Sequence, residues 1–218
     1  MVTSEFQRAR SATAKHQREQ AILDAAAALG AEHGIRQVTL TDIAEVIGMH
    51  KSALLRYFET RELIFLRLTA AGWRDWSTAV RDGLDVLTDH TPAAVANVFA
   101  ATLTARPMFC DLLAQAPLNL ERNVSLESVR AFKLVTLEEV TAIVEAVRGV
   151  LPALDTTDGV DVIATATSLA GAFWQMATPG PEVQALYRSD PRLAHAVVNV
   201  EPRLVRILTA QMTGLLAR

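Results

Sequence analysis

The chain has 218 residues, half of them apolar, with a formal charge of −3 and one cysteine. This length allows one large domain, or two smaller ones, around a sizeable core. The single cysteine excludes an internal disulfide or a metal site built from several cysteines, and it fits a reducing, cytoplasmic environment.

Apolar residues recur with helical spacing along nearly the whole chain, and no stretch shows the alternation of a strand. We therefore expect an all-α fold. The first 18 residues are polar and basic, which is typical of a flexible arm and not of a signal peptide. A first helix is expected over Lys15–His33, because Gly34 supplies a C-terminal stop. Thr39 or Thr41 caps a second helix, which ends at Gly48.

The third expected helix, Met49–Phe58, is short and rich in polar side chains. Prolines and short polar stretches separate the later helices, and Leu118–Val150 fits either one long helix or two. A loose segment is expected between the sequence "TPGP" and Pro202, which suits the start of a last helix. The later helices are expected over Thr60–Leu87, Pro92–Ala105, Pro107–Ala116, Leu118–Val150, Asp158–Ala177 and Pro202–Leu216.

The uncharged run from Val162 to Pro181 is long enough to invite a membrane interpretation. Threonine, serine, glutamine and two prolines dilute its hydrophobicity, and Asp158 and Asp161 lie just before it. We expect a buried helix here and no membrane partner.

A helix, a glycine-containing turn and a second short helix follow one another between Thr39 and Phe58, which is the helix-turn-helix arrangement. In this arrangement the first helix packs against its domain, and the second presents polar side chains to the major groove of DNA. The pattern alone also fits a solvated helix in an ordinary bundle. The outward polar residues of the second helix are His50, Lys51, Ser52 and Arg56.

The stretch "ILDAAAALGAEHGIRQVTLTDIAEVIGMHKSALLRYFETRELI" resembles the N-terminal domain of the TetR family of bacterial transcriptional regulators. The matches are an alanine-rich first helix, Gly34, Thr39, "DIAEVIG", a short helix ending on "YF", and a basic residue before Glu-Leu. The resemblance implies a homodimer that binds double-stranded operator DNA. It also implies a DNA-binding domain over residues 19–65, and a C-terminal domain over residues 66–218 for effector binding and dimerisation.

The resemblance further implies which side chains meet DNA, through the cap of the second helix, the recognition helix and the residues after it. The chain departs from the family at Leu55, where a tyrosine usually contacts phosphate, so that contact is in doubt. Arg61 replaces a usual lysine, and Gly30 replaces a bulky aromatic residue. The implied DNA contacts are Thr39, Thr41, His50, Lys51, Ser52, Arg56, Tyr57 and Arg61.

The expected arm over residues 1–18 carries several basic side chains and one acid. The first 74 residues as a whole have a net charge of +2, and the rest of the chain has −5. Such an arm either follows the DNA backbone or enters the minor groove, or it is a solvated tail. The basic residues are Arg8, Arg10, Lys15, His16 and Arg18.

Large apolar residues are frequent after Thr60, and charges are sparse between Ala93 and Leu120. An apolar cavity with a few polar groups is the usual form of a small-molecule site, although core packing alone explains most of these residues. We expect an apolar or weakly polar effector of unknown identity. The candidate pocket residues are Trp73, Trp76, Phe99, Met108, Phe109, Phe132 and Trp174.

The sequence "VIATATSLAGAFWQMA" is rich in small residues, which let two helices approach closely, and the last helix has an apolar face. The two helices either form a four-helix bundle between two subunits or are buried in one monomer. The candidate residues of a dimer interface are Ala170, Gly171, Leu204, Leu208 and Met212.

No P-loop, GxSxG, HExxH or Rossmann glycine pattern occurs, and the five histidines lack metal-ligand spacing. We therefore expect neither an enzyme nor a bound metal or cofactor. The favoured function is a ligand-responsive transcriptional repressor that binds a palindromic operator as a dimer and is released by its effector. The alternative is a helical protein–protein interaction module with a weakened DNA-binding motif.

Overall fold

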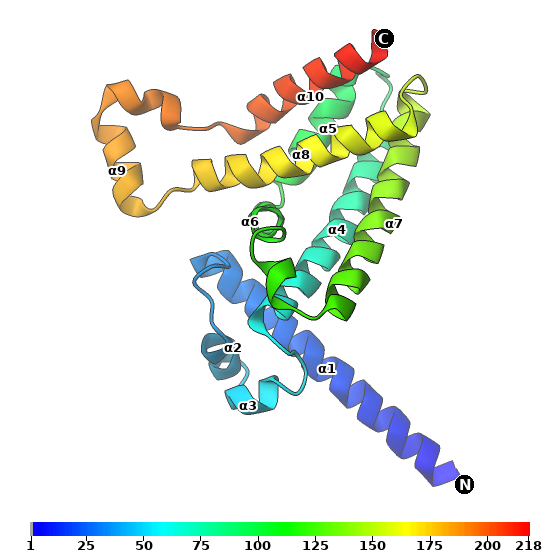
Figure 1. Cartoon of the computed structure of the whole chain (residues 1–218), viewed down its shortest axis with the longest axis vertical. Coiled ribbons are helices and arrows are strands. Elements are labelled where there is room, and N and C mark those ends of the chain that lie inside the picture. Colours follow the sequence, from blue (N-terminus) through cyan, green and yellow to red (C-terminus); the bar gives the residue numbers. More distant parts are fainter. Residues whose placement is uncertain (1) are drawn as a thin grey trace.

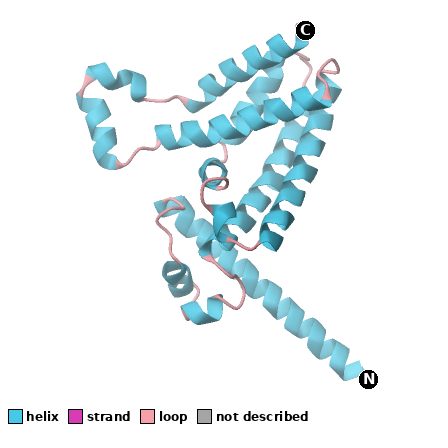
Figure 2. Cartoon of the chain, viewed as in Figure 1, coloured by secondary structure: helices cyan, strands magenta, loops and turns pink. Residues whose placement is uncertain are grey.

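The computed structural model describes residues 2–218, with side chains from Thr13 onward. The expected all-α class is confirmed, because the described chain consists of helices and loops without a strand (Figure 2). In chain order the elements are α1 Val2–His33, α2 Leu40–Val46, α3 Lys51–Leu54, α4 Arg61–Asp85, α5 Pro92–Thr104, α6 Pro107–Gln115, η1 Leu120–Asn123, α7 Leu126–Val150, α8 Thr156–Ala177, α9 Pro181–Ser189, η2 Pro191–Ala196 and α10 Val200–Leu216.

Helices α1, α2 and α3 form one end of the molecule, and the first part of α1 extends away from it (Figure 1). Gly34 ends α1 with a φ of +81°, a left-handed conformation that glycine adopts without steric cost. The helix begins at Val2, so its backbone is helical through most of the segment that we expected to be a flexible arm. The side chains of Arg8 and Arg10 lie outside the described residues, and a role of this segment on DNA stays a prediction.

Helix α4 joins the two ends of the molecule. Thr60 caps its first turn by accepting a hydrogen bond from the backbone N–H of Leu63 at 3.1 Å. Helix α4 packs against α1, α5, α6, η1 and α7. The buried apolar side chains of both ends form one continuous cluster, which runs from Ile43 through Phe65 to Met212. A displacement of α4 therefore changes packing at both ends.

Helices α5 to α8 and α10 form the larger end. Helix α7 packs against α4 and α8, α6 packs against α8, and α10 packs against α5 and α8. The segment Leu118–Val150 is two helices, because η1 ends at Asn123 and Ser125 begins α7 as its N-cap. Within the described residues no single helix is long and apolar enough to cross a membrane, although α5 and α6, bent by 89° between them, pass that test as a pair.

Several helix boundaries differ from the sequence-based expectation, and one segment expected to be loose is helical. Helix α3 ends at Leu54 and continues as turns to Tyr57, whereas a helix over Met49–Phe58 was expected. The segment expected to be loose contains α9 and η2, and neither of these helices has a buried residue. Helix α10 begins at Val200, and Pro202 lies within its first turn, where a missing N–H costs no hydrogen bond.

Candidate nucleic-acid interface

The turn between α2 and α3 depends on Gly48, whose φ of +63° favours glycine. The backbone N–H of Met49 donates to the carbonyl oxygen of Ala44 at 2.8 Å and closes the turn. Leu54 and Phe58 are buried and anchor α3 to the domain. This geometry fixes which face of α3 points outward.

The outward face of α3 is polar and free. His50, Lys51, Ser52 and Arg56 are all exposed. None of these four side chains makes a hydrogen bond or an ion pair with another described residue. Their donors are therefore available to DNA phosphates and base edges. The sequence-based assignment of these four residues agrees with their placement, and their contacts with DNA stay a prediction.

Thr39 is the N-cap of α2, as one of the two expected alternatives had it. Its hydroxyl accepts from the backbone N–H of Asp42 at 3.2 Å, and its own backbone N–H donates to the Asp42 carboxylate at 2.7 Å. The backbone hydrogen bond from Thr39 holds the pKa of Asp42 below its usual range, with a smaller effect of the Thr39 hydroxyl. This capping box fixes the start of α2 and leaves Thr41 exposed beside α3.

Arg61 has its side-chain donors engaged inside the protein, and its expected position near DNA phosphates stays a prediction. Its guanidinium donates to the backbone carbonyl oxygens of Val38 and Ile35, and it also pairs with Glu62 at 3.1 Å. It lies over the ring of Phe65, 4.7 Å from the centroid. These contacts use its donors inside the protein, so Arg61 holds the loop before α2 against α4. A lysine, with a single ammonium, could not make the same set of contacts.

The residues after α3 divide between the surface and the interior. Leu55, which stands where the family usually has a tyrosine, is 43% exposed and offers no hydrogen-bond donor. Tyr57 is half-buried and packs against the core. Arg56, the next residue, is an exposed cation, and its contact with phosphate stays a prediction.

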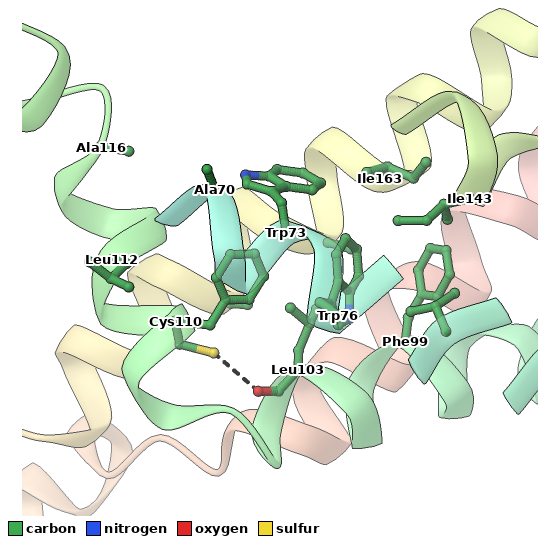
Figure 3. Close-up of a cluster of buried hydrophobic side chains, with 14 of the residues drawn as sticks. Ala70, Trp73, Trp76, Phe99, Leu103, Cys110, Leu112, Ala116, Ile143 and Ile163 are labelled. Carbon is green, nitrogen blue, oxygen red and sulfur yellow. Dashed lines mark hydrogen bonds between the residues drawn. The ribbon is translucent and has the colours of Figure 1, made fainter. Parts of the chain in front are cut away.

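The candidate pocket residues do not line one cavity. Trp73, Trp76, Phe99 and Phe109 are buried, and three of their ring pairs pack edge to face with centroids 5.5 to 5.8 Å apart. Figure 3 shows Trp73, Trp76 and Phe99 in this cluster. Trp76 also donates from Nε1 to the Thr102 hydroxyl at 3.0 Å. Core packing, which the sequence left open as the alternative, therefore accounts for these four rings.

The remaining candidate pocket residues line two separate hollows. Phe132 lies in a groove between α4 and α7 with a cavity volume of about 90 Å³. Met108 and Trp174 lie in a larger groove between the end of α1, α6 and the end of α8, with about 1610 Å³ of atom-free space, part of it open to solvent. The candidate pocket residues are therefore divided among the core and these two grooves, and an effector site among them stays a prediction.

The dimer residues named from sequence are buried inside one chain. Ala170, Leu204, Leu208 and Met212 are fully buried, because α10 packs on α5 and α8. Gly171 is also buried, and a Cβ atom on it would lie 2.9 Å from the backbone nitrogen of Ala114 in α6. These five residues are therefore not available to a dimer interface, because they pack between helices of the same subunit.

Two acidic residues that sequence reasoning did not assign connect the DNA-binding end to the rest of the chain. Glu59 accepts hydrogen bonds from the backbone N–H of Ser125 at 2.9 Å and from the Ser128 hydroxyl at 3.1 Å. Asp111 accepts from the backbone N–H of Ile35 at 3.1 Å. Nothing in the local sequence marks either contact, because the partners lie 66 and 76 residues away.

Cys110 is unsuited to redox chemistry in this fold. The thiol is buried and donates to the carbonyl oxygen of Leu103 at 3.3 Å (Figure 3). Burial, with a smaller effect of the neighbouring Asp111 charge, raises the pKa of Cys110 to about 12. The thiol therefore stays protonated near neutral pH.

Three solved structures resemble the chain at low sequence identity. The fatty acid degradation regulator FadR from Bacillus halodurans matches with a TM-score of 0.51 and 16% identity, over 91% of this chain and 94% of that one. The TetR family regulator PfmR from Thermus thermophilus gives 0.47 and 19%, over 71% and 95%. AmtR from Mycobacterium smegmatis gives 0.46 and 19%, over 89% and 93%. At these identities the likeness concerns the fold alone.

Family comparisons cover nearly all of the described helices. No curated protein sequence matches the chain. Residues 22–68 match the family described as bacterial regulatory proteins, tetR family, and residues 70–218 match the tetracyclin repressor-like, C-terminal domain. The chain therefore belongs to the TetR family of bacterial transcriptional regulators, with a helix-turn-helix at its DNA-binding end and a helical C-terminal domain.

Proposed function

We propose that the protein is a ligand-responsive repressor that binds a palindromic operator as a two-fold dimer. The observation that carries this proposal is the outward face of α3, where His50, Lys51, Ser52 and Arg56 are exposed and free. Free cationic and hydroxyl groups on a helix anchored by Leu54 fit the requirements of major-groove binding. This function requires no catalytic group and no cofactor.

A dimer is proposed through the outer face of α8. Five of its residues, spaced four apart along the helix, are exposed, and the three in the middle are small. Such a row can pack closely against the same row of a second subunit, because i and i+4 side chains form one ridge of a helix. On α10, which packs against α8, the small residues Ala210 and Gly214 are also exposed. The row on α8 consists of Val160, Ala164, Ser168, Ala172 and Met176.

Release by an effector is proposed to act through α4. This helix contacts both α1 and the C-terminal helices, and both grooves described above border the DNA-binding end. An effector changes DNA affinity only as far as it prefers one arrangement of these helices over another. A release of tenfold to hundredfold corresponds to about 1.4–2.8 kcal/mol, within the usual range of allosteric coupling.

A protein–protein interaction module remains the second candidate function, on one observation. Leu55 is 43% exposed at a position beside the recognition helix, where an apolar side chain gains nothing from phosphate. In that case the α3 surface would meet a protein partner rather than DNA.

The test is selection of bound DNA from a random pool by the full chain, followed by gel-shift titration of the selected sequence. The repressor proposal predicts an enriched palindrome, bound by a dimer with strong salt dependence. No enrichment over an unselected pool would rule out sequence-specific DNA binding. Transcription from a promoter that contains the selected site, with and without the protein, then distinguishes a repressor from an activator.

A further inference from the structure

The groove between the first halves of α4 and α7 combines an apolar floor with two arginines. Leu66, Ala70 and Phe132 form its buried part, and Arg67 and Arg74 stand at its edge. These arginines are two helical turns apart, about 10 Å along α4. The full lining is Leu63, Leu66, Arg67, Ala70, Arg74, Ser128, Ala131, Phe132 and Val135.

Neither arginine is neutralised within the described chain. Arg67 and Arg74 are exposed, and their side chains make no hydrogen bond or ion pair with another described residue. The two acids on the same stretch of α4 are engaged elsewhere. Glu62 pairs with Arg61 at 3.1 Å, and Asp75 pairs with Arg106 at 2.6 Å. The edge of the groove is therefore cationic, above an apolar floor.

We propose that this groove binds an amphiphilic anion, whose apolar chain lies on the floor and whose carboxylate or phosphate group is bound by Arg67 and Arg74. Guanidinium groups bind planar oxyanions through paired N–H donors, and apolar contact holds the chain. The charged head group goes beyond the apolar or weakly polar effector expected from sequence.

The groove also borders a direct connection to the DNA-binding end. Ser128 lines the groove, and its hydroxyl donates to the carboxylate of Glu59 at 3.1 Å. Glu59 lies in the short loop between α3 and α4 and also accepts from the backbone N–H of Ser125, the N-cap of α7. A ligand that contacts Ser128 in the groove would compete with Glu59 for the Ser128 hydroxyl and would loosen the loop that follows the recognition helix. This regulatory step rests on the proposed function, whereas the binding step does not.

Binding is tested by isothermal titration of the full-length protein with decanoate and decyl phosphate, with decanol as the uncharged probe of the same chain. We expect both anions to bind about tenfold or more tightly than decanol. Arg67→Gln and Arg74→Gln should each remove about tenfold of the affinity for whichever anion binds and leave decanol unchanged. Comparison of the two anions identifies the carboxylate or the phosphate as the preferred head group.

Two further variants keep this test decisive. Arg130→Gln removes an exposed arginine of α7 that does not line the groove, and it should leave every affinity unchanged. Ala131→Phe adds a ring to an exposed position of the lining, and it should abolish binding of all three probes without loss of helical signal. The proposal is overturned if decanol binds as tightly as the anions, or if Arg67→Gln and Arg74→Gln bind the anions like Arg130→Gln.

Coupling is tested separately with the selected operator. The bound anion should weaken DNA binding of the wild type, and Glu59→Gln should reduce this effect at least threefold while anion affinity without DNA is retained. An anion that binds but leaves DNA affinity unchanged overturns the regulatory step alone. Failure to bind any DNA would instead contradict the proposed function, and the titrations without DNA would still decide the binding step.

Discussion

Asp111 in α6 accepts a hydrogen bond from the backbone N–H of Ile35, at 3.1 Å, and thereby joins the C-terminal domain to the loop before α2. Its second carboxylate oxygen accepts from the side-chain amide of Gln175 in α8 at 2.7 Å. One carboxylate thus connects the DNA-binding end to two helices of the C-terminal domain. Together with Arg61, which holds the same loop from α4, it fixes where the helix-turn-helix lies.

Replacement of Asp111 by alanine should destabilise the protein by about 1–3 kcal/mol, because a partly buried N–H of Ile35 loses its acceptor. Asp111→Asn retains one carbonyl oxygen as an acceptor and should lose less stability than Asp111→Ala. The free energy of unfolding, measured by urea denaturation, gives both values. Equal stability of all three proteins would show that the link contributes nothing to the fold.

Lys51→Ala should weaken binding to all DNA sequences and lower the salt-dependence slope by about 1, because it removes one phosphate contact. The matched control is Arg188→Ala, which removes an exposed cation from α9, far from α3 in the fold (Figure 1). Gel-shift titrations at several salt concentrations measure both quantities. If Lys51→Ala matched the control, the outward face of α3 would not be the DNA-contacting face.

Substitutions of Ser52 and Thr41 should change sequence preference rather than overall affinity. Both side chains are exposed hydroxyls at the recognition surface, and each base pair read by such a group is worth about 1–3 kcal/mol. Selection from a random pool with Ser52→Ala and with Thr41→Ala should yield a relaxed base preference at different positions of the half-site. The same consensus as the wild type would show that these hydroxyls contact only the backbone.

The local elements could be predicted from sequence because their signals are local. Gly34 and Gly48 mark turns that need a positive φ, and Thr39 and Thr60 are the capping residues of α2 and α4. The turn and capping contacts of these residues join positions at most four apart along the chain, so a short sequence pattern can reveal them. The outward face of α3 follows from the same logic, once Leu54 is assigned to the interior.

Contacts between distant helices could not be predicted in this way. Small residues such as Ala170 and Gly171 fit close helix packing either between two subunits or within one. Only the position of α6 shows that these two pack inside one subunit. The aromatic residues were ambiguous for the same reason, since Trp76 suits a pocket wall as well as a core. The contacts of Glu59 and Asp111 depend on partners 66 and 76 residues away, which no local pattern reports.

The proposed dimer should dissociate on Ser168→Glu, which places a charge in the middle of the exposed row on α8 without filling any space inside the subunit. Thr141→Glu adds the same charge to an exposed position of α7 and serves as the control. Light scattering at micromolar concentration should show a dimer for the wild type and the control, and a monomer for Ser168→Glu. A monomeric wild type would exclude this interface.

Gly171→Ala, by contrast, should lower stability rather than dissociate a dimer. Its Cβ atom would lie 2.9 Å from the backbone nitrogen of Ala114, so α6 and α8 must move apart. Overpacking of this kind costs about 1–3 kcal/mol. Gly149→Ala in α7 is the control, because a Cβ there meets no atom within 4 Å. The unfolding midpoints of the two variants in urea should therefore differ.

Glu59 should make the stability of the protein depend on pH in the acid range. The backbone N–H of Ser125, with smaller effects of the Ser125 and Ser128 side chains, holds the pKa of Glu59 below its usual range. The unfolded chain, with the ordinary and higher pKa, then binds more protons than the folded chain as the pH falls. The contribution of Glu59 is consequently complete above the ordinary pKa of glutamate, about 4.3, and is lost as the pH falls through the lower pKa of the folded state.

Glu59→Gln removes this charge and should lower the unfolding midpoint in urea at pH 7, with a difference from wild type that shrinks below about pH 4. Ser125 and Ser128 still meet an amide oxygen in this variant, so the pH-dependent part of the difference reports the charge and not the loss of an acceptor. The control is Glu45→Gln in α2, whose exposed carboxylate accepts no hydrogen bond from another described residue. A difference for Glu59→Gln that stays constant from pH 7 down to about pH 3 would mean that the capping of α7 does not depend on the carboxylate charge.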